Sequence, residues 1–127
     1  RDSVDVVLIT NYHSLLALPY LTEFGGFCGK VFATEATLLL GRNLMLELAK
    51  LAASASSENP TAFFQPPGEH PYTVRDAQSA ADRVSIVNYG QVVGIAAGLT
   101  ATPRSSGYGL GAANWLLECG LNKIVIL

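Results

Sequence analysis

The sequence predicts an α/β fold, and three observations support this prediction. A short run of mostly β-branched residues, Val4–Thr10, is typical of a strand that is covered on both faces. Helical patterns follow over Glu35–Ala53 and over Val74–Arg83. After Arg83 the sequence is rich in Val, Ile and Leu, which favours strands. Strands and helices therefore alternate first, and strands follow one another afterwards.

The composition is that of a globular domain. The chain has 127 residues, of which 50% are hydrophobic and 14% are charged, and this balance excludes a disordered chain. Arg42, Glu47 and Lys50 interrupt the most apolar stretch, so no segment reaches the ~20 apolar residues that span a bilayer. Lys and Arg number 8 against 10 Asp and Glu, without a basic block, which argues against an autonomous nucleic-acid-binding domain. Cys28 and Cys119 lack metal or redox spacing and are predicted to be free thiols in a reducing compartment.

Both ends of the chain suggest a longer domain. Residue 1 is Arg rather than Met, and Asn122–Leu127 reads as a strand without a polar tail. Because an exposed strand edge invites pairing, we expect this strand to lie within a larger sheet. Residues 1–127 are thus predicted to be part of one domain.

The first strand is expected to end at Asn11-Tyr12-His13. The segment Ser14–Leu21 reads as a short helix that is broken or kinked near Pro19, and Gly25-Gly26 turns the chain. Lys30–Thr34 is the second predicted strand.

The helix Glu35–Ala53 has a clear start and two distinct faces. Thr34 is a good N-cap, and Glu47 and Lys50 are spaced to form an i,i+3 ion pair on the polar face. Four leucines are expected to form the apolar stripe: Leu40, Leu44, Leu48 and Leu51.

A Pro/Ser-rich loop is predicted at about residues 54–72. A connection of this length is usually functional or disordered. Phe63 and Phe64 are the candidates for partner contact within it, because adjacent aromatic residues in a loop can anchor a partner. The alternative, that they cap the domain's own core, stays open.

The second helix begins at Thr73, because Asp76 lies three residues later in a capping-box pattern. A glycine-rich loop is expected at Pro103–Gly111. The remaining segments are predicted strands: Val84–Asn88, Gln91–Thr102, Ala113–Cys119 and Asn122–Leu127.

The residues do not form a recognisable catalytic constellation. A two-zinc hydrolase needs roughly five to seven ligands, mainly His and Asp. The chain has 2 histidines, His13 after the first strand and His70 in the Pro-rich loop. Ser105 and Ser106 lack a G-x-S-x-G elbow, and Gly107–Gly111 lacks both the G-x-G-x-x-G spacing and a Walker lysine. We therefore predict no catalytic residue, metal or cofactor.

Five segments carry a specific resemblance to a known family: Asn11–His13, Ala17–Tyr20, Ala33–Thr37, Pro103–Gly111 and Asn114-Trp115. Together they resemble the metallo-β-lactamase domain of the β-CASP RNA-processing nucleases. The resemblance runs through most of the chain and weakens between Ala52 and Tyr72. It implies that the α/β fold is part of a metallo-β-lactamase-type αββα sandwich.

The resemblance also implies a degenerate metal site. Active members hold zinc with a His-x-His-x-Asp-His signature after the first strand, and here Asn11 stands at its first position while only His13 keeps a ligand type. Leu15 and Leu16 follow in a shortened segment without Asp or His, and Tyr108 stands where a later zinc-binding histidine is found. We expect Tyr12, Leu15, Leu16 and Tyr108 to fill the vacated cleft by apolar burial.

The resemblance implies a non-catalytic scaffold subunit in the nucleus. Two partners are implied. One is Integrator complex subunit 11, which is the catalytic β-CASP paralogue, and the other is Integrator complex subunit 4. Together they would form a module that cleaves small nuclear RNA 3′ ends. RNA would be reached only through the assembled complex, and no membrane contact is implied. Three alternatives stay open: the inactive 100 kDa subunit of the cleavage and polyadenylation specificity factor, an active metal-dependent RNA nuclease with ligands outside this chain, and a small-molecule hydrolase.

Overall fold

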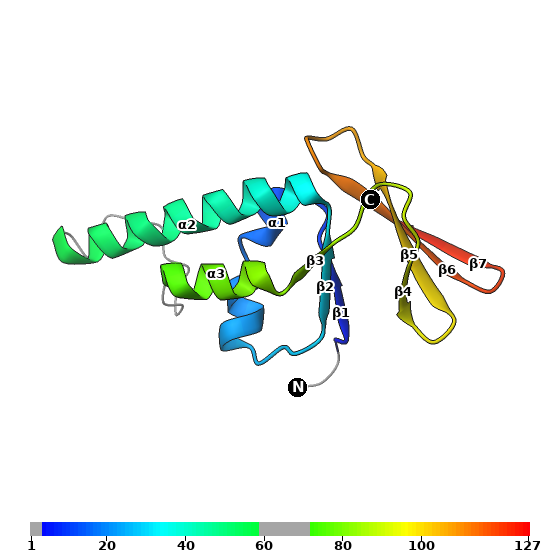
Figure 1. The fold of residues 1–127 in the computed structure, drawn as a ribbon, viewed down its shortest axis with the longest axis horizontal. Coiled ribbons are helices and arrows are strands. Elements are labelled where there is room, and N and C mark those ends of the chain that lie inside the picture. The colour runs from blue at the N-terminus through cyan, green and yellow to red at the C-terminus, as the bar shows by residue number, and fades with distance from the viewer. Residues whose placement is uncertain (1–3, 59–71) are drawn as a thin grey trace.

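The computed structural model describes residues 4–58 and 72–127 (Figure 1). Phe63, Phe64 and His70 lie outside the described residues. In chain order the elements are β1 (Val6–Leu8), α1 (Tyr12–Leu15), η1 (Tyr20–Phe24), β2 (Lys30–Ala33), α2 (Glu35–Glu58), α3 (Val74–Asp82), β3 (Val84–Ile86), β4 (Val93–Ala96), β5 (Leu99–Ser105), β6 (Ala113–Cys119) and β7 (Asn122–Ile126).

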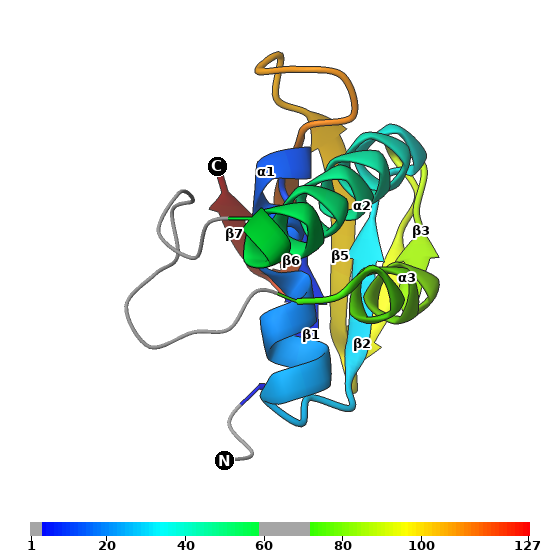
Figure 2. The same cartoon turned by 90° about the vertical axis from the view of Figure 1, so that its left-hand side faces the viewer.

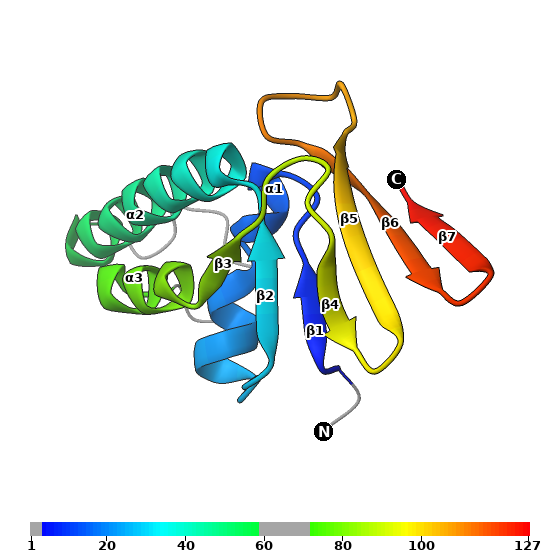
Figure 3. The ribbon, with the colours of Figure 1, turned by 45° about the vertical axis from the view of Figure 1, so that its right-hand side comes forward.

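These elements form three layers. A parallel sheet of order β1-β2-β3 lies between the helices on one face and an antiparallel sheet of order β4-β5-β6-β7 on the other (Figures 1 and 3). The helices belong to the connections between the parallel strands, as parallel pairing requires. Figure 2 shows α2 and α3 side by side against this sheet. The α/β prediction is confirmed, and among the described residues the order of layers is helices, sheet, sheet.

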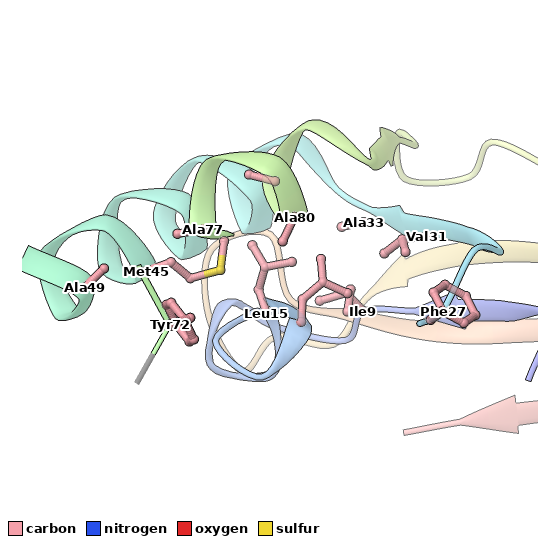
Figure 4. Close-up of a cluster of buried hydrophobic side chains, with 12 residues drawn as sticks. Ile9, Leu15, Phe27, Val31, Ala33, Met45, Ala49, Tyr72, Ala77 and Ala80 are labelled. Atoms are coloured by element: carbon pink, nitrogen blue, oxygen red, sulfur yellow. The ribbon is translucent and has the colours of Figure 1, made fainter. Parts of the chain in front are cut away.

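The main core lies between the helices and the parallel sheet (Figure 4). Met45 of α2, Leu15 of α1 and Val31 of β2 are fully buried there. Small residues let the helices approach closely: Ala77 and Ala80 of α3 are completely buried in the same cluster. No helix in the described ranges combines the length and hydropathy that crossing a bilayer requires.

The start of α2 agrees with the sequence, but its buried face does not. Thr34 caps the helix, because its Oγ1 accepts a hydrogen bond from Thr37 N at 3.3 Å. The predicted leucine stripe is wrong, because these side chains lie on the outer face, between 37% and 49% exposed. The buried stripe instead follows i,i+4 spacing along Thr37, Gly41, Met45 and Ala49.

The end of α2 also differs from the prediction. The helix continues through residues 54–58, which were expected to belong to the loop, and ends at Glu58. Each added helical residue gains a backbone hydrogen bond once a helix exists, and neither Ala nor Ser opposes this strongly. The ion pair expected on its polar face is present, with Lys50 Nζ 3.7 Å from Glu47 Oε1.

The other two helical predictions are close to the structure. Thr73 caps α3 in a complete capping box, because it accepts a hydrogen bond from Asp76 N while Asp76 accepts one from Thr73 N. The chain is helical on both sides of Pro19, which is the N-cap of η1, where a missing N–H is tolerated.

The predicted strand Gln91–Thr102 is in fact two strands. β4 and β5 form a hairpin that turns at Gly98, whose φ is +73°. β5 then continues through Pro103 to Ser105, so the loop before β6 is shorter than predicted. Pro103 is tolerated because β4 pairs with β5 only as far as Ala101, which leaves no ladder bond for its missing N–H.

Candidate functional site

The predicted site residues lie at the carboxyl ends of the parallel strands. Asn11 and His13 follow β1, and Thr34 follows β2, so the fold places them at the same edge of the sheet. The loop between β5 and β6 lies at this end of the molecule, next to the start of α2 (Figures 1 and 3). A hydrogen bond joins the end of this loop to the residues that follow β1, because the N–H of Ala113, the first residue of β6, donates to Thr10 O at 2.7 Å.

Asn11 acts as the N-cap of α1, so its side-chain oxygen is not free to bind a metal ion. Its Oδ1 accepts hydrogen bonds from Ser14 N at 3.0 Å and from Ser14 Oγ at 3.3 Å. This capping satisfies a helix N–H group that would otherwise be unpaired. His13 is exposed in α1, with its ring centroid 4.2 Å from that of Tyr12.

Leu15 and Leu16 belong to the main core. Leu15 is fully buried and packs against α2 at Gly41, where an added Cβ would lie only 2.3 Å from Leu15 Cδ2. Leu16 is partly buried against the same cluster. These two leucines therefore join α1 to α2.

Tyr108 does not fill a cleft. Its side chain is 71% exposed at the end of the β5–β6 loop, so the expectation of a buried tyrosine at this position is wrong. The space beside the start of α2 is taken by backbone instead, because Gly111, with φ +81°, packs against it.

A set of hydrogen bonds holds the loop at its base. Thr34 Oγ1 and Thr37 Oγ1 both donate to Gly111 O, at 2.6 and 2.9 Å. The Tyr89 hydroxyl donates to Ala112 O at 2.8 Å. The sequence analysis identified Thr34 only as a helix cap. It missed these hydrogen bonds to the loop, which we call the clamp, although Thr34 and Thr37 stand three residues apart at the start of α2.

Trp115 connects the same edge to the antiparallel sheet. It is fully buried, and its Nε1 donates to Ile9 O at 3.0 Å. Phe32, Val87 and Ala101 surround it in a second core between the two sheets. The β5–β6 loop is therefore followed by a strand whose Trp115 is anchored in this core.

The residues at these positions do not fit a zinc ion. The Asn11 oxygen is used by the helix cap, leucine offers no donor atom, and only His13 is a common zinc ligand. Across residues 4–58 and 72–127 there is no cluster of three or more His, Cys, Asp or Glu. Cys28 and Cys119 are free, as predicted, and both are exposed. The arrangement supports a hydrogen-bonded framework and offers no set of metal ligands.

Comparison with known proteins decides the family. The family model of the metallo-beta-lactamase superfamily domain matches residues 2–127. The chain belongs to this superfamily.

Relatives within this superfamily include RNA-processing proteins. The chain is 37% identical to Integrator complex subunit 9 of Mus musculus over 97% of its own length and 21% of that protein. It is 34% identical to the Integrator complex subunit 9 homolog of Nematostella vectensis, covering 98% of the chain and 22% of the relative. Endoribonuclease YSH1 of Candida albicans is 30% identical over 98% of the chain and 14% of the enzyme. The chain thus spans about a fifth of the length of the Integrator relatives.

The comparison with solved structures gives one further similarity. The zinc-bound PqqB protein of Methylobacterium extorquens is 20% identical, with a TM-score of 0.49, over 98% of this chain and 36% of that one.

Proposed function

We propose that this metallo-beta-lactamase-type chain is part of a non-catalytic scaffold subunit of the Integrator complex, in the nucleus. Two observations support the proposal. The chain is similar to Integrator complex subunit 9 over 97% of its length. The position of the first expected ligand carries Asn11, whose oxygen is engaged by Ser14. The second observation carries the non-catalytic part, because a site that keeps only His13 as a common zinc ligand lacks the donor set that holds a zinc ion and activates its bound water.

Under this proposal catalysis belongs to a β-CASP paralogue. The expected partners are Integrator complex subunit 11, as the catalytic member of a heterodimer, and Integrator complex subunit 4. Small nuclear RNA would reach the catalytic partner through the assembled complex. The chain itself has no basic block to hold RNA, with 8 Lys and Arg against 10 Asp and Glu.

A metal-dependent RNA nuclease is the second candidate function. The similarity to Endoribonuclease YSH1, at 30% identity over 98% of the chain, favours it. It would require zinc ligands from outside residues 1–127, in place of those missing at Asn11 and Tyr108.

Metal content and partners of the full-length protein distinguish these functions. The protein is purified from nuclear extract, its zinc is measured by elemental analysis, and its partners are identified by mass spectrometry. We expect far less than one zinc ion per chain, together with recovery of Integrator subunits. About two zinc ions per chain with RNA cleavage by the protein alone would establish the nuclease instead. Recovery of polyadenylation factors would assign the scaffold to the cleavage and polyadenylation specificity factor.

The matched control is a His13→Ala variant prepared in the same way. It removes the one remaining ligand type at the site. Under the scaffold proposal, its zinc content and its partners equal those of the wild type.

A further inference from the structure

The threonines of the clamp are buried, and their hydrogen bonds are all made within the chain. Thr37 is completely buried, Thr34 is 5% exposed, and the hydroxyl group of each donates to Gly111 O. Thr34 Oγ1 also accepts a hydrogen bond from Thr37 N, so this hydroxyl group acts as donor and acceptor at once. Across residues 4–58 and 72–127, no buried side-chain nitrogen or oxygen atom lacks a hydrogen-bond partner. In this part of the chain, the buried polar side chains therefore do not depend on a ligand for their hydrogen bonds.

The clamp and its neighbouring bonds join segments that are far apart in the sequence. The bonds to Gly111 link the start of α2 with the β5–β6 loop across 77 and 74 residues. The connection between β3 and β4 reaches the same loop, because the Tyr89 hydroxyl donates to Ala112 O. The segment after β1 reaches it as well, because Ala113 N donates to Thr10 O. Three other segments thus converge on the base of one loop.

Burial strengthens the bonds from the two threonines. Water does not compete for buried hydroxyl groups, and a buried group that loses its partner costs the full free energy of its desolvation. The bonded atoms all belong to described residues, so any further protein around this edge would bury them more deeply without supplying these bonds. The clamp is therefore a property of the chain itself.

A zinc ion cross-links the segments that supply its ligands, and this cross-linking contributes to the free energy of folding. At the edge described above, the ligand set does not fit zinc, since only His13 is a common ligand and the Asn11 oxygen caps α1. We propose that the clamp performs the cross-linking at this edge, and that it holds the β5–β6 loop against α2 without a metal ion. The inference goes beyond the proposed scaffold function, because it concerns how the loop is held and requires no partner.

Hydrogen exchange of the full-length protein, followed by mass spectrometry, reports on the loop directly. The N–H groups of Ser106, Ala112 and Ala113 are hydrogen-bonded, so their exchange is slow only while the loop keeps its conformation. We expect the exchange of peptides that cover these residues to be the same before and after treatment with EDTA, and after incubation with zinc chloride. Faster exchange with EDTA, or slower exchange with zinc chloride, would show that a metal ion holds the loop and would overturn the inference.

Two substitutions of Thr37 separate the hydrogen bond from packing. Valine is close to threonine in size but lacks the hydroxyl group, so we expect Thr37→Val to raise the exchange rate of the loop about fivefold. Thr37→Ser keeps the hydroxyl group, and its exchange rate should stay within about twofold of the wild type. The matched control is Thr22→Val, because Thr22 is also buried and donates to a backbone carbonyl, that of Leu18, away from the loop. It should leave the exchange of the loop unchanged.

Tyr89→Phe tests the clamp even if Thr37→Val does not fold. Tyr89 is 45% exposed, and this substitution removes only the hydroxyl group that donates to Ala112 O. We expect the exchange rate of the loop to rise about threefold. Wild-type exchange of the loop in Tyr89→Phe, or in a folded Thr37→Val variant, would contradict the inference.

The outcomes separate this inference from the proposed function. If the wild-type protein recovers no Integrator subunits while the loop responds to the substitutions and ignores EDTA, the proposed function fails and the clamp stands. If Integrator subunits are recovered while EDTA releases the loop, the inference about the clamp fails and the assignment to the complex stands.

Discussion

At the scale of single residues, Gly111 is fixed in close contact with the start of α2. Its φ of +81° lies in the left-handed region, and a Cβ at this position would lie 2.6 Å from Thr37 N. Glycine alone satisfies both conditions, since it has no Cβ and tolerates positive φ. The backbone at residue 111 thus reaches the start of α2 because this residue has no side chain.

We therefore expect Gly111→Ala to lower the free energy of unfolding by about 2 kcal/mol or more, from strain and from loss of the clamp. Gly109→Ala is the matched control, because a Cβ there meets no atom within 4 Å, and it should change the value by no more than about 0.5 kcal/mol. Urea unfolding followed by circular dichroism measures both variants. Equal stability of the two variants would contradict this account of the clamp.

Among the described residues, Tyr72 has a clear pKa shift. Burial raises the pKa of Tyr72 from 10.0 to about 12, and the neighbouring Tyr20 adds to the shift. The two rings meet edge to face, with centroids 5.3 Å apart. The folded state therefore holds the phenolic proton more strongly than the unfolded state does.

The sign of the pH effect follows from this difference. Between pH 10 and 12 the unfolded chain loses the Tyr72 proton while the folded chain keeps it, so stability falls as the pH rises. We expect this residue to account for a loss on the order of 2 kcal/mol over that window. Tyr72→Phe should show a shallower decrease, measured by urea unfolding at several pH values. Parallel curves for the wild type and the variant would show that Tyr72 does not carry the effect.

At the scale of elements, α2 shows how packing chooses between two apolar faces. The leucines form the more hydrophobic stripe. Nevertheless Met45 is fully buried, while Leu44, one position earlier, is 38% exposed. The buried face carries Gly41 and Ala49, which let α1 and α3 approach. Close approach of helices depends on small residues, and hydrophobicity alone does not report it.

Substitutions in α2 test this assignment. We expect Met45→Ala to lower the free energy of unfolding by about 2 to 4 kcal/mol, because it leaves a cavity in the core. Leu44→Ala should lower it by less than about 1 kcal/mol, since its side chain is partly hydrated already. Urea unfolding of both variants measures the difference. A larger loss for Leu44→Ala would restore the leucine stripe as the packed face.

At the scale of the whole molecule, Trp115 joins the two sheets. It is the only tryptophan of the chain, it is fully buried between the sheets, and its indole N–H bonds to Ile9 O. Its fluorescence therefore reports directly on the contact between the sheets.

We expect Trp115→Phe to lower the free energy of unfolding by about 2 to 3 kcal/mol, because it removes buried volume and leaves a carbonyl without its donor. Phe24→Leu is a suitable control, since Phe24 is 58% exposed, and we expect a change of no more than about 0.5 kcal/mol. Far-UV circular dichroism during urea unfolding suits both variants, as it does not need the tryptophan. A neutral effect of Trp115→Phe would mean that the sheets are held together elsewhere.

The sequence by itself determined the class of the fold and several of its local features. The capping residues Thr34 and Thr73, the strand Ala113–Cys119 and the Glu47–Lys50 pair depend on near neighbours, so local patterns predict them. Only the tertiary structure decided which face of α2 is buried, the division of Gln91–Thr102 into two strands, and the exposure of Tyr108. The buried face of α2 depends on a contact between distant segments, because Leu15 of α1 packs against Gly41. The bonds from Thr34 and Thr37 to Gly111 span more than 70 residues, and no local pattern contains them.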